Sequence, residues 1–340
     1  MGDMTVQRRR HASIIDVAAL AGVSVTTVSH TLSQRRPVSA ATRERVLDAI
    51  AELGYQPNDL ARSMRSQRTN TIALVIPDIT NPFYTSVARG LQDAIQADTY
   101  FGIVCNTDAN PDLERKTVEQ LVKRRVDGIV FSGYYQHQED IRPAVSVGIP
   151  VVLLGSHRPK EGYDVVNGAD HESGAEATRY LIGRGHRRIG FITAPAGSGA
   201  PAVRVDGYRA ALHEAGIPAE PDLLLRAPVS GDGGAQGMNA LLDLPEPPDA
   251  VIATNDVVAI GAIGAAHARG LRIPDDIAVM GFDDIEAARL ITPKLTTMAN
   301  QSHQIGHAAG RLVLQRIAGE GPPDPQEVVF SAQLRRRESA

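Results

Sequence analysis

Four short side chains near the N-terminus have the chemistry to contact DNA bases. Thr26, Ser29 and His30 can donate or accept hydrogen bonds, and Val25 offers a methyl surface. Groups of this size can reach the base edges in a major groove, where each base pair presents its own pattern of donors, acceptors and methyl groups. The stretch DVAALAGVSVTTVSH therefore predicts a nucleic-acid contact, provided that the chain holds these four side chains on one outer face.

The residues around Gly22 predict two short helices joined by a tight turn. Ser13 followed by Asp16 has the spacing of a capping box, which marks a helix start. Gly22 supplies the backbone freedom of a C-terminal cap, and Ser24 can cap the second helix. The first helix is expected to bury one side, formed by Val17, Ala18 and Ala21.

The second helix is expected to face inward through Val28 and Leu32, which are four residues apart. A third helix is predicted from Ser39 to Leu53, ending at Gly54, and would close a small three-helix core. Helix pairs that turn at a glycine also occur in enzymes, so this pattern alone leaves the function open.

The composition is that of a globular chain with unevenly distributed charge. The 340 residues are 43% hydrophobic and 22% charged, enough for a small domain and one or two larger ones. Residues 1–70 carry a net charge of +4, whereas the whole chain carries −4. A basic head on an acidic body is typical of a chain whose head alone binds phosphates, although Arg8, Arg9 and Arg10 can also be read as a solvated tail.

The sequence predicts a cytoplasmic protein. Its single cysteine, Cys105, excludes an intramolecular disulfide framework and fits a reducing compartment. The basic start QRRRHASIID is followed by an apolar run that Asp16 interrupts, without a cleavage pattern. No apolar run reaches the length of a membrane span.

Motifs for catalysis and metal binding are weak. GDGGAQG lacks the glycine spacing of a dinucleotide site and is expected to be a loop, and AGSGA lacks the nucleophile-elbow pattern. His303 and His307 are four residues apart but have no evident third metal ligand. Asp283 and Asp284 are expected to face different ways at a strand end. We predict no enzymatic activity, no cofactor and no metal.

The segment YQPNDLARSMRSQRTN is typical of a linker that folds when a partner binds. It offers barely two turns of helix, too short to be stable alone. The blocks IIDVAALAGVSVTTVSHTLS and VSAATRERVLDAIAELGYQPNDLARSM resemble the DNA-binding head and hinge helix of the LacI/GalR (lactose-repressor) family. Within it, TTVSH is similar to the recognition helix of the purine repressors. The resemblance extends over nearly the whole chain.

That resemblance implies DNA contacts at matched positions of the head and hinge. The residues that would read bases in the major groove are Val25, Thr26, Ser29 and His30. Those that would hold phosphates are Ser24, Ser39, Thr42 and Tyr55. Asn58 would cap the hinge helix, and Ala61 and Met64 would enter the minor groove and bend the duplex. Met64 stands where the family commonly has leucine, and its alternative is a solvated linker side chain.

After Asn70, apolar strand patterns alternate with helical ones. TIALVIPD, FGIVCNTD, DGIVFSG and IPVVLLG form one series, and RRIGFITAP, PDAVIATND and IAVMGFDD form a second. This alternation indicates two doubly wound parallel sheets, with a ligand held beyond the carboxyl ends of their strands. GHRRIGFI, IATNDVVAIGAI, IPDDIAVMGFDDIE and LRRRES resemble the α/β periplasmic-binding-protein-like effector domain of the same family.

The predicted organisation has three parts: a small all-α helix-turn-helix head at 11–57, a hinge helix and linker at 58–69, and an effector-binding and dimerisation domain at 70–338. The resemblance implies three crossings between the subdomains of the last part. The first subdomain would hold about 70–167 and 300–326, and the second about 168–299 and 327–338. Helices of the first subdomain would supply the main dimer contact. No leucine heptads follow RRRESA, which favours a homodimer over a tetramer.

The resemblance also implies an effector site. The residues at matched ligand-contacting positions are Asn81, Phe83, Ser132, Arg204, Asn255 and Asp283. Their groups suit a polyhydroxylated molecule such as a sugar. As alternatives, Asn255 and Asp283 can cap helices, and Arg204 can pair with Asp206 or another carboxylate on the surface. Gly155 and Asn300 stand where sugar-responsive members often have aspartate and glutamine, so the sequence does not identify the effector.

The sequence thus predicts a homodimeric transcriptional repressor that binds a pseudo-palindromic, double-stranded operator. A small metabolite between the subdomains, most favourably a sugar, would control operator affinity by binding one closure state better than the other. The sequence leaves open whether the metabolite induces or co-represses. The alternative is a cytoplasmic solute-binding protein without DNA function, against which the VTTVSH stretch and the hinge argue.

Overall fold

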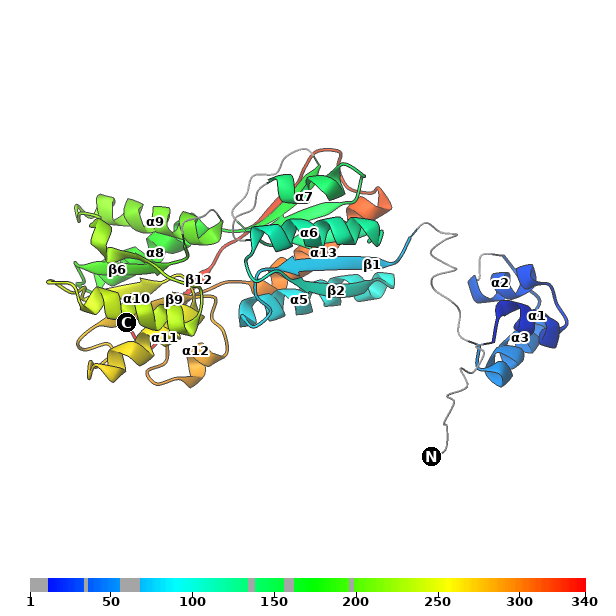
Figure 1. The fold of residues 1–340 in the computed structure, drawn as a ribbon, viewed down its shortest axis with the longest axis horizontal. Helices are drawn as coiled ribbons and strands as arrows, with labels where there is room; N and C mark the ends of the chain where they lie inside the picture. The colour runs from blue at the N-terminus through cyan, green and yellow to red at the C-terminus, as the bar shows by residue number, and fades with distance from the viewer. Residues whose placement is uncertain (1–11, 34–35, 56–67, 134–137, 156–161, 196–198) are drawn as a thin grey trace, which may run out of the picture. The chain divides into compact units, whose positions relative to one another are not determined.

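A computed structural model describes residues 12–33, 36–55, 68–133, 138–155, 162–195 and 199–340. The chain forms two compact units, Met1–Thr69 and Asn70–Ala340 (Figure 1). In the described part of the chain, no single helix has the length and apolar character to cross a membrane. Ile14–Ala21 and Val25–Leu32 reach those criteria only as a pair, across a bend of 103°.

The described residues of the first unit form a bundle of three helices, α1 (Ile14–Ala21), α2 (Val25–Ser33) and α3 (Ala40–Leu53). Its capping follows the prediction, since Asp16 N donates to the Ser13 hydroxyl at 3.3 Å and Ser13 N donates to the Asp16 carboxylate at 2.8 Å. Gly22 ends α1 with a left-handed φ of 63°. The core is closed by Val17, Ala18, Ala21, Val28, Val46 and Ala49.

The predicted inward face of α2 is partly wrong. Val28 is buried, but Leu32 is exposed and Thr31 is buried in its place. The helical repeat allows either the third or the fourth residue after Val28 to point inward. Thr31 can do so because its hydroxyl donates to Thr27 O at 2.9 Å, which satisfies the polar group within its own helix.

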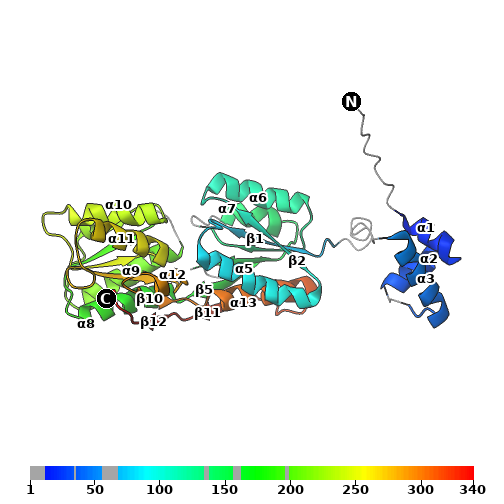
Figure 2. The ribbon, with the colours of Figure 1, turned by 90° about the horizontal axis from the view of Figure 1, so that it is seen from below.

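The first sheet of the second unit has six parallel strands in the order β11-β5-β4-β3-β1-β2. Their bounds are β1 Thr71–Ile76, β2 Phe101–Asn106, β3 Gly128–Phe131, β4 Val151–Leu154, β5 Tyr163–Gly168 and β11 Glu327–Phe330. One face is covered by α5 (Pro82–Ile95) and α13 (Ser302–Ala318), and the other by α6 (Pro111–Lys123) and α7 (Gln138–Val145), as Figure 2 shows. Coverage of both faces explains why the inner strands are apolar along their whole length.

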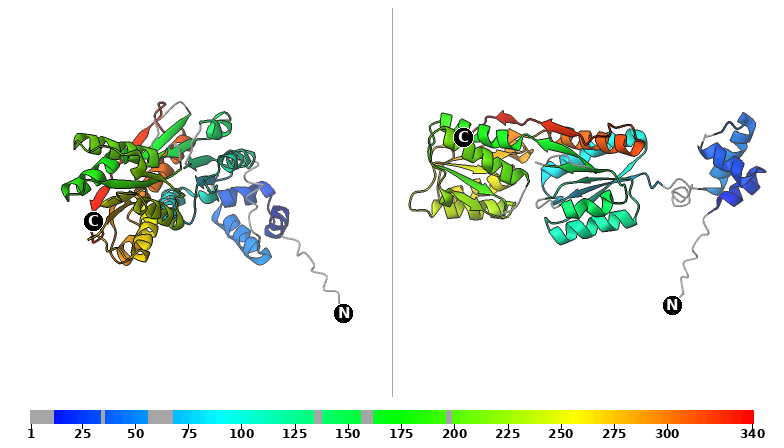
Figure 3. Two further views of the ribbon diagram at one scale, coloured as in Figure 1. Left: turned by 60° about the vertical axis from the view of Figure 1, so that its left-hand side comes forward. Right: turned by 90° about the horizontal axis from the view of Figure 1, so that it is seen from above.

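The second sheet has the order β12-β10-β9-β8-β6-β7, in which β12 alone runs antiparallel to its neighbour. The strands are β6 Ile189–Thr193, β7 Leu224–Arg226, β8 Ala250–Ala253, β9 Ala278–Phe282, β10 Thr296–Ala299 and β12 Gln333–Arg335. The helices α8 (Asp170–Gly183) and α9 (Ala200–Glu214) cover one face, and α10 (Gly231–Leu242) and α11 (Asp256–Ala268) the other (Figure 3). A short helix, α12 (Ala287–Leu290), follows β9. Two doubly wound subdomains are therefore present, as predicted.

Two details of the sequence analysis need correction. Residues 327–330, which we assigned to the second subdomain, form β11 and pair with β5 of the first sheet. They do so because β11 follows α13, which packs on that sheet, so the third crossing lies at 331–332. GDGGAQG is the start of α10 rather than a loop, because Ser230 caps the helix by accepting from Gly233 N at 3.1 Å.

Some helices that share a face of a sheet are in backbone contact through pairs of glycines, namely α5 with α13, α8 with α9, and α10 with α11. A Cβ on Gly90 of α5 would lie 1.9 Å from His303 O of α13, and one on Gly306 would lie 2.0 Å from Val87 O. The same reciprocal contact joins α8 to α9 through Gly174 and Gly207, and α10 to α11 through Gly234 and Gly261. Any side chain at these six positions would force the two helices of a pair apart.

Candidate functional site

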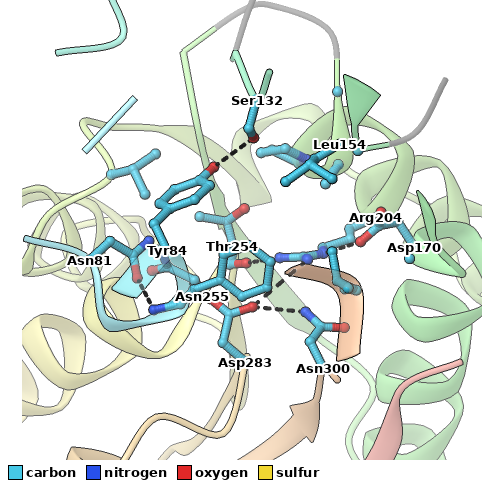
Figure 4. A pocket seen from close by; sticks show the side chains of 18 of the residues that line it. Asn81, Tyr84, Ser132, Leu154, Asp170, Arg204, Thr254, Asn255, Asp283 and Asn300 are labelled. Carbon is cyan, nitrogen blue, oxygen red and sulfur yellow. Dashed lines mark hydrogen bonds and ion pairs between the residues drawn. The ribbon is translucent and has the colours of Figure 1, made fainter. Parts of the chain in front are cut away.

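A cavity lies between the two subdomains, at the carboxyl ends of their parallel strands (Figure 4). The volume of the cavity is about 90 Å³. The six predicted effector residues, Asn81, Phe83, Ser132, Arg204, Asn255 and Asp283, all line it. Their convergence follows from the topology, because each comes from a segment that leaves a strand end or begins the next helix.

Arg204 is held at the cavity by a carboxylate and a carbonyl. Its Nε donates to Asp170 Oδ1 at 2.8 Å, and its NH1 donates to Thr254 O at 2.7 Å. The alternative, in which Arg204 pairs with Asp206 or another carboxylate on the surface, is not realised, since Asp206 faces Arg209 at 3.7 Å and the partner of Arg204, Asp170, is buried. Burial alone would lower the pKa of Arg204, but the two carboxylates of Asp170 and Asp283 outweigh it and raise that pKa. Arg204 is therefore a fixed cation in the wall of the cavity.

Asp283 is held in a backbone conformation that L-residues rarely adopt, with φ of 105°. Its amide donates to Met298 O, and its carboxylate accepts from Asn300 Nδ2, each at 2.8 Å. Burial raises the pKa of its carboxyl, against the opposing effects of Arg204 and Asn300. In these contacts Asp283 is a strand-end carboxylate that faces the cavity, not a helix cap.

The two residues after Asp283, Asp284 and Ile285, are held by hydrogen bonds to other parts of the second subdomain. Asp284, with φ of 56°, turns away and accepts from both Arg337 and Arg289, so the two aspartates face different ways as predicted. Buried Asp256 accepts from Ile285 N at 2.9 Å and from the Thr297 hydroxyl at 2.6 Å. Burial, reinforced by Asp283, raises the pKa of Asp256 well above its ordinary value.

The two asparagines combine capping with a place in the cavity wall. Asn255 Oδ1 accepts from Val258 N, and Asn81 Oδ1 accepts from Phe83 N, each at 3.0 Å. The capping alternative for Asn255 is therefore realised, and capping fixes the orientation of both side chains at the cavity.

The sequence analysis missed several lining residues, among them Tyr84, Asp170 and Thr254. Tyr84 OH is 3.5 Å from the Ser132 hydroxyl, and burial raises the pKa of Tyr84 to about 12. Their positions in the sequence could have identified them as cavity residues. Each of the three lies next to a predicted site residue or just beyond a strand end, where side chains of parallel sheets converge.

The head presents the four predicted base-reading residues on α2. Val25 and Thr26 are exposed, and Ser29 and His30 are half-buried. Ser24 and Ser39 act as helix caps, accepting from Thr27 N at 3.1 Å and Thr42 N at 3.3 Å. Tyr55 packs partly against the head core. Asn58, Ala61 and Met64 lie outside the described residues, so their roles stay predictions.

His303 does not gather metal ligands in the described part of the chain, where no group of three or more histidine, cysteine, aspartate or glutamate side chains comes together. Its Nε2 lies 2.9 Å from Asp93 Oδ2, which links α13 to α5.

Comparisons with known proteins agree over most of the chain. Residues 13–58 match bacterial regulatory proteins of the lacI family, and residues 69–333 match the periplasmic binding proteins and sugar binding domain of LacI family. The HTH-type transcriptional repressor PurR of Haemophilus influenzae (strain PittEE) is 35% identical over 308 residues, covering 90% of this chain and 91% of PurR.

Two solved structures extend the comparison to ligands. A transcriptional regulator CelR in complex with cellobiose has a TM-score of 0.74 and 32% identity, covering 97% of this chain and 100% of CelR. A LacI family transcriptional regulator from Enterococcus faecium with bound ribose has a TM-score of 0.71 and 28% identity, covering 79% of this chain and 98% of that regulator. With both domains matched in order and relatives of this identity, the chain belongs to the LacI family of bacterial regulatory proteins.

Proposed function

We propose that this protein is a cytoplasmic transcriptional repressor without enzymatic activity, whose operator affinity is set by an uncharged sugar bound in the cavity. The observation that carries the proposal is the convergence of six polar or aromatic residues from both subdomains on one cavity, in a chain that also has a DNA-binding head. A ligand that bonds to both walls stabilises one closure of the subdomains over others, and this difference in affinity is what shifts DNA binding.

The charges of the cavity favour an uncharged effector. Among the described residues of the wall, one cation, Arg204, faces two carboxylates, Asp170 and Asp283, so their ionised side chains sum to a negative charge. A phosphorylated or acidic sugar would bring a second anion beside the buried Asp283 without a free cation in the described wall to meet it. Hydroxyl groups suit the site, since each can donate to a carboxylate and accept from a guanidinium.

The sugars bound by similar proteins support the same class of effector. The similar regulators hold cellobiose and ribose, which are both uncharged. The wall of this cavity adds apolar surface from Phe83, Leu154 and Val229, against which the C–H face of a sugar ring can pack.

The operator is proposed to be read by α2 of the head. Val25, Thr26, Ser29 and His30 would contact bases, while Ser24, Ser39, Thr42 and Tyr55 would contact phosphates. The proposed minor-groove wedge by Ala61 and Met64, with Asn58 as the hinge cap, adds a bend at the operator centre. Phosphate contacts make such binding strongly dependent on salt.

The proposed assembly is a homodimer through the first subdomain, and two heads then suit a pseudo-palindromic operator. The edge strand β2 leaves Phe101 66% exposed and Val104 43% exposed, and Leu113 of the neighbouring α6 is also exposed. An open strand edge with large apolar side chains is a surface that a second copy would cover. Sedimentation velocity tests this, because Val104→Asp should convert dimer to monomer.

The decisive experiment is selection of random duplexes by the purified protein, followed by gel-shift titration with and without a panel of neutral sugars and sugar phosphates. Enrichment of a palindrome that is lost at high salt, together with a change of affinity caused by a neutral sugar, supports the proposal. A protein that binds a sugar but enriches no duplex would instead be the solute-binding protein without DNA function. A response to sugar phosphates alone would overturn the uncharged effector.

A further inference from the structure

Thr107 in the first sheet and Thr254 in the second have similar local backbone settings, although β2 is an edge strand and β8 an inner one. Each is the first residue after a parallel strand, Thr107 after β2 and Thr254 after β8. Each backbone amide donates to the neighbouring strand, Thr107 N to Ile76 O at 3.0 Å and Thr254 N to Ile192 O at 2.8 Å. Both residues are buried, with exposed fractions of 0% and 2%. The two threonines are therefore comparable in their local backbone and burial.

Their hydroxyl groups differ. Thr107 Oγ1 donates back to Ile76 O at 3.1 Å, so it is satisfied within the protein. Thr254 Oγ1 is buried and has no hydrogen-bond partner among the described residues. Buried hydroxyl groups in proteins are nearly always hydrogen-bonded, because an unpaired one loses its contacts with water and gains nothing in return. The unpaired hydroxyl of Thr254 therefore calls for a functional explanation.

The position of Thr254 supplies that explanation, because the residue lines the cavity between Tyr84 and Arg204 (Figure 4). Its carbonyl accepts from Arg204 NH1 at 2.7 Å, which fixes its backbone against the main cation of the wall. Asn255, the next residue, caps the N-terminus of α11 and lines the same cavity. Thr254 is thus held rigidly among groups that the proposed function assigns to the effector.

We propose that the Thr254 hydroxyl is a specificity contact that hydrogen-bonds a hydroxyl group of the bound sugar. This inference rests on the proposed function and adds a residue to it. A hydroxyl that can both donate and accept matches a sugar hydroxyl, and it disfavours a deoxy analogue, which would leave it unpaired. The contact would therefore discriminate between sugars that differ at one position of the ring.

The two threonines allow a matched test, because valine has nearly the shape of threonine and carries a methyl group in place of the hydroxyl. In the full-length protein without sugar, Thr107→Val should lower the melting temperature, since it removes a satisfied bond. Thr254→Val should keep or raise it, since it removes an unpaired buried hydroxyl. The test sugar is the neutral sugar, from a panel including ribose and cellobiose, that raises the melting temperature of the unchanged protein most. Thr254→Val should weaken binding of this sugar about tenfold. Thr107→Val should leave that affinity unchanged, and Thr254→Ser should restore most of it.

Each other outcome has one meaning. If Thr254→Val lowers the sugar-free melting temperature as much as Thr107→Val does, the hydroxyl is satisfied inside the protein and the inference is wrong. If the unchanged protein binds a sugar and Thr254→Val binds it equally well, the inference fails while the proposed function stands. If no neutral sugar raises the melting temperature of the unchanged protein, the sugar effector of the proposed function is wrong, and the sugar contact of Thr254 is wrong with it.

Discussion

Arg204 NH2 and Asp283 Oδ1 face each other at 4.0 Å, whereas the same guanidinium donates to Asp170 at 2.8 Å. The longer separation is beyond a direct hydrogen bond, although the charges still attract. A single hydroxyl group placed near both residues can accept from Arg204 and donate to Asp283. Asp283 is therefore more available than Asp170 to bind the hydroxyl group of a sugar, and substitutions at Asp283 should change sugar affinity.

Replacing Asp283 with asparagine should weaken binding of the neutral sugar by about tenfold to a hundredfold, because a hydrogen bond to a charged acceptor becomes a neutral one. Operator binding without sugar should remain within about threefold of the unchanged protein. Calorimetric titration with the sugar and gel-shift titration with the selected duplex measure the two effects. Asp206→Asn removes the same charge from an exposed position of α9 and serves as the control. Equal effects of the two substitutions would contradict a role for Asp283 at the site.

Replacing Arg337 with methionine should reduce both stability and sugar affinity. Arg337 donates to Asp284, and this pair helps to hold Asp283 at its unusual φ of 105°. Loss of this largely buried pair should lower the free energy of unfolding by about 2 kcal/mol, with Asp284 keeping only Arg289. Urea unfolding and sugar titration check the two effects.

The neighbouring Arg336 provides the control for that substitution. It is exposed and lies over the Tyr180 ring at 5.6 Å, so Arg336→Met changes the same charge without touching Asp284. We expect a change in the free energy of unfolding below about 1 kcal/mol and unchanged sugar affinity. Sugar affinity that survives in Arg337→Met would show that the loop holds Asp283 without this arginine.

Two glycines of α8 should respond oppositely to alanine. A Cβ on Gly174 would lie 2.2 Å from Arg204 O, so Gly174→Ala should separate α8 from α9 and lower the free energy of unfolding by about 2 kcal/mol. Because the contact is with Arg204 itself, sugar affinity should fall as well. A Cβ on Gly183 meets nothing within 4 Å, so Gly183→Ala should be neutral or stabilising by up to about 1 kcal/mol. Chemical denaturation compares them, and equal effects would argue against backbone contact between the helices.

The buried carboxyl of Asp256 should give the protein a specific dependence on pH. Burial raises its pKa in the folded state above the value of about 3.9 expected in the unfolded chain. The folded state therefore holds this proton more tightly. The resulting stabilisation is fully present below the unfolded pKa and is lost as the pH rises through the folded pKa.

Asp256→Asn isolates this contribution. Asparagine cannot accept equally from Ile285 N and the Thr297 hydroxyl, so the variant should be less stable at every pH. The informative quantity is the difference in unfolding free energy between the unchanged protein and the variant, measured by urea denaturation from pH 4 upward. That difference should decrease as the pH rises, by at most about 1.4 kcal/mol per pH unit. A constant or increasing difference would contradict the raised pKa.

The sequence was most informative where one local rule decides the structure. Ser13 with Asp16 and the left-handed Gly22 define the first helix whatever surrounds them, and both were predicted. The alternation of apolar strands and amphipathic helices predicted both parallel sheets. The inward side of α2 was harder, because the choice between Thr31 and Leu32 depends on how three helices meet.

The features of the cavity also include some that the sequence predicted and some that it did not. Its six predicted residues came from resemblance to a family, and the structure brings all of them to one cavity. The pairing of Arg204 with Asp170 could not be predicted, because the partners are 34 residues apart and their distance depends on the packing of α8 against α9. Similarly, nothing in the local sequence says that the hydroxyl of Thr107 is paired and that of Thr254 is not.

The glycine contacts between paired helices have a mechanical consequence. Since the backbones of α5 and α13, of α8 and α9, and of α10 and α11 already touch, the helices of a pair cannot slide closer or bend locally without steric overlap. Each subdomain is therefore a stiff body, and a change in closure must be absorbed by rotation of a few backbone angles in the three short connections that join the subdomains. A displacement of a fraction of an ångström at Asp283, which follows β9, therefore moves the second subdomain as a whole relative to the first instead of being dissipated inside it.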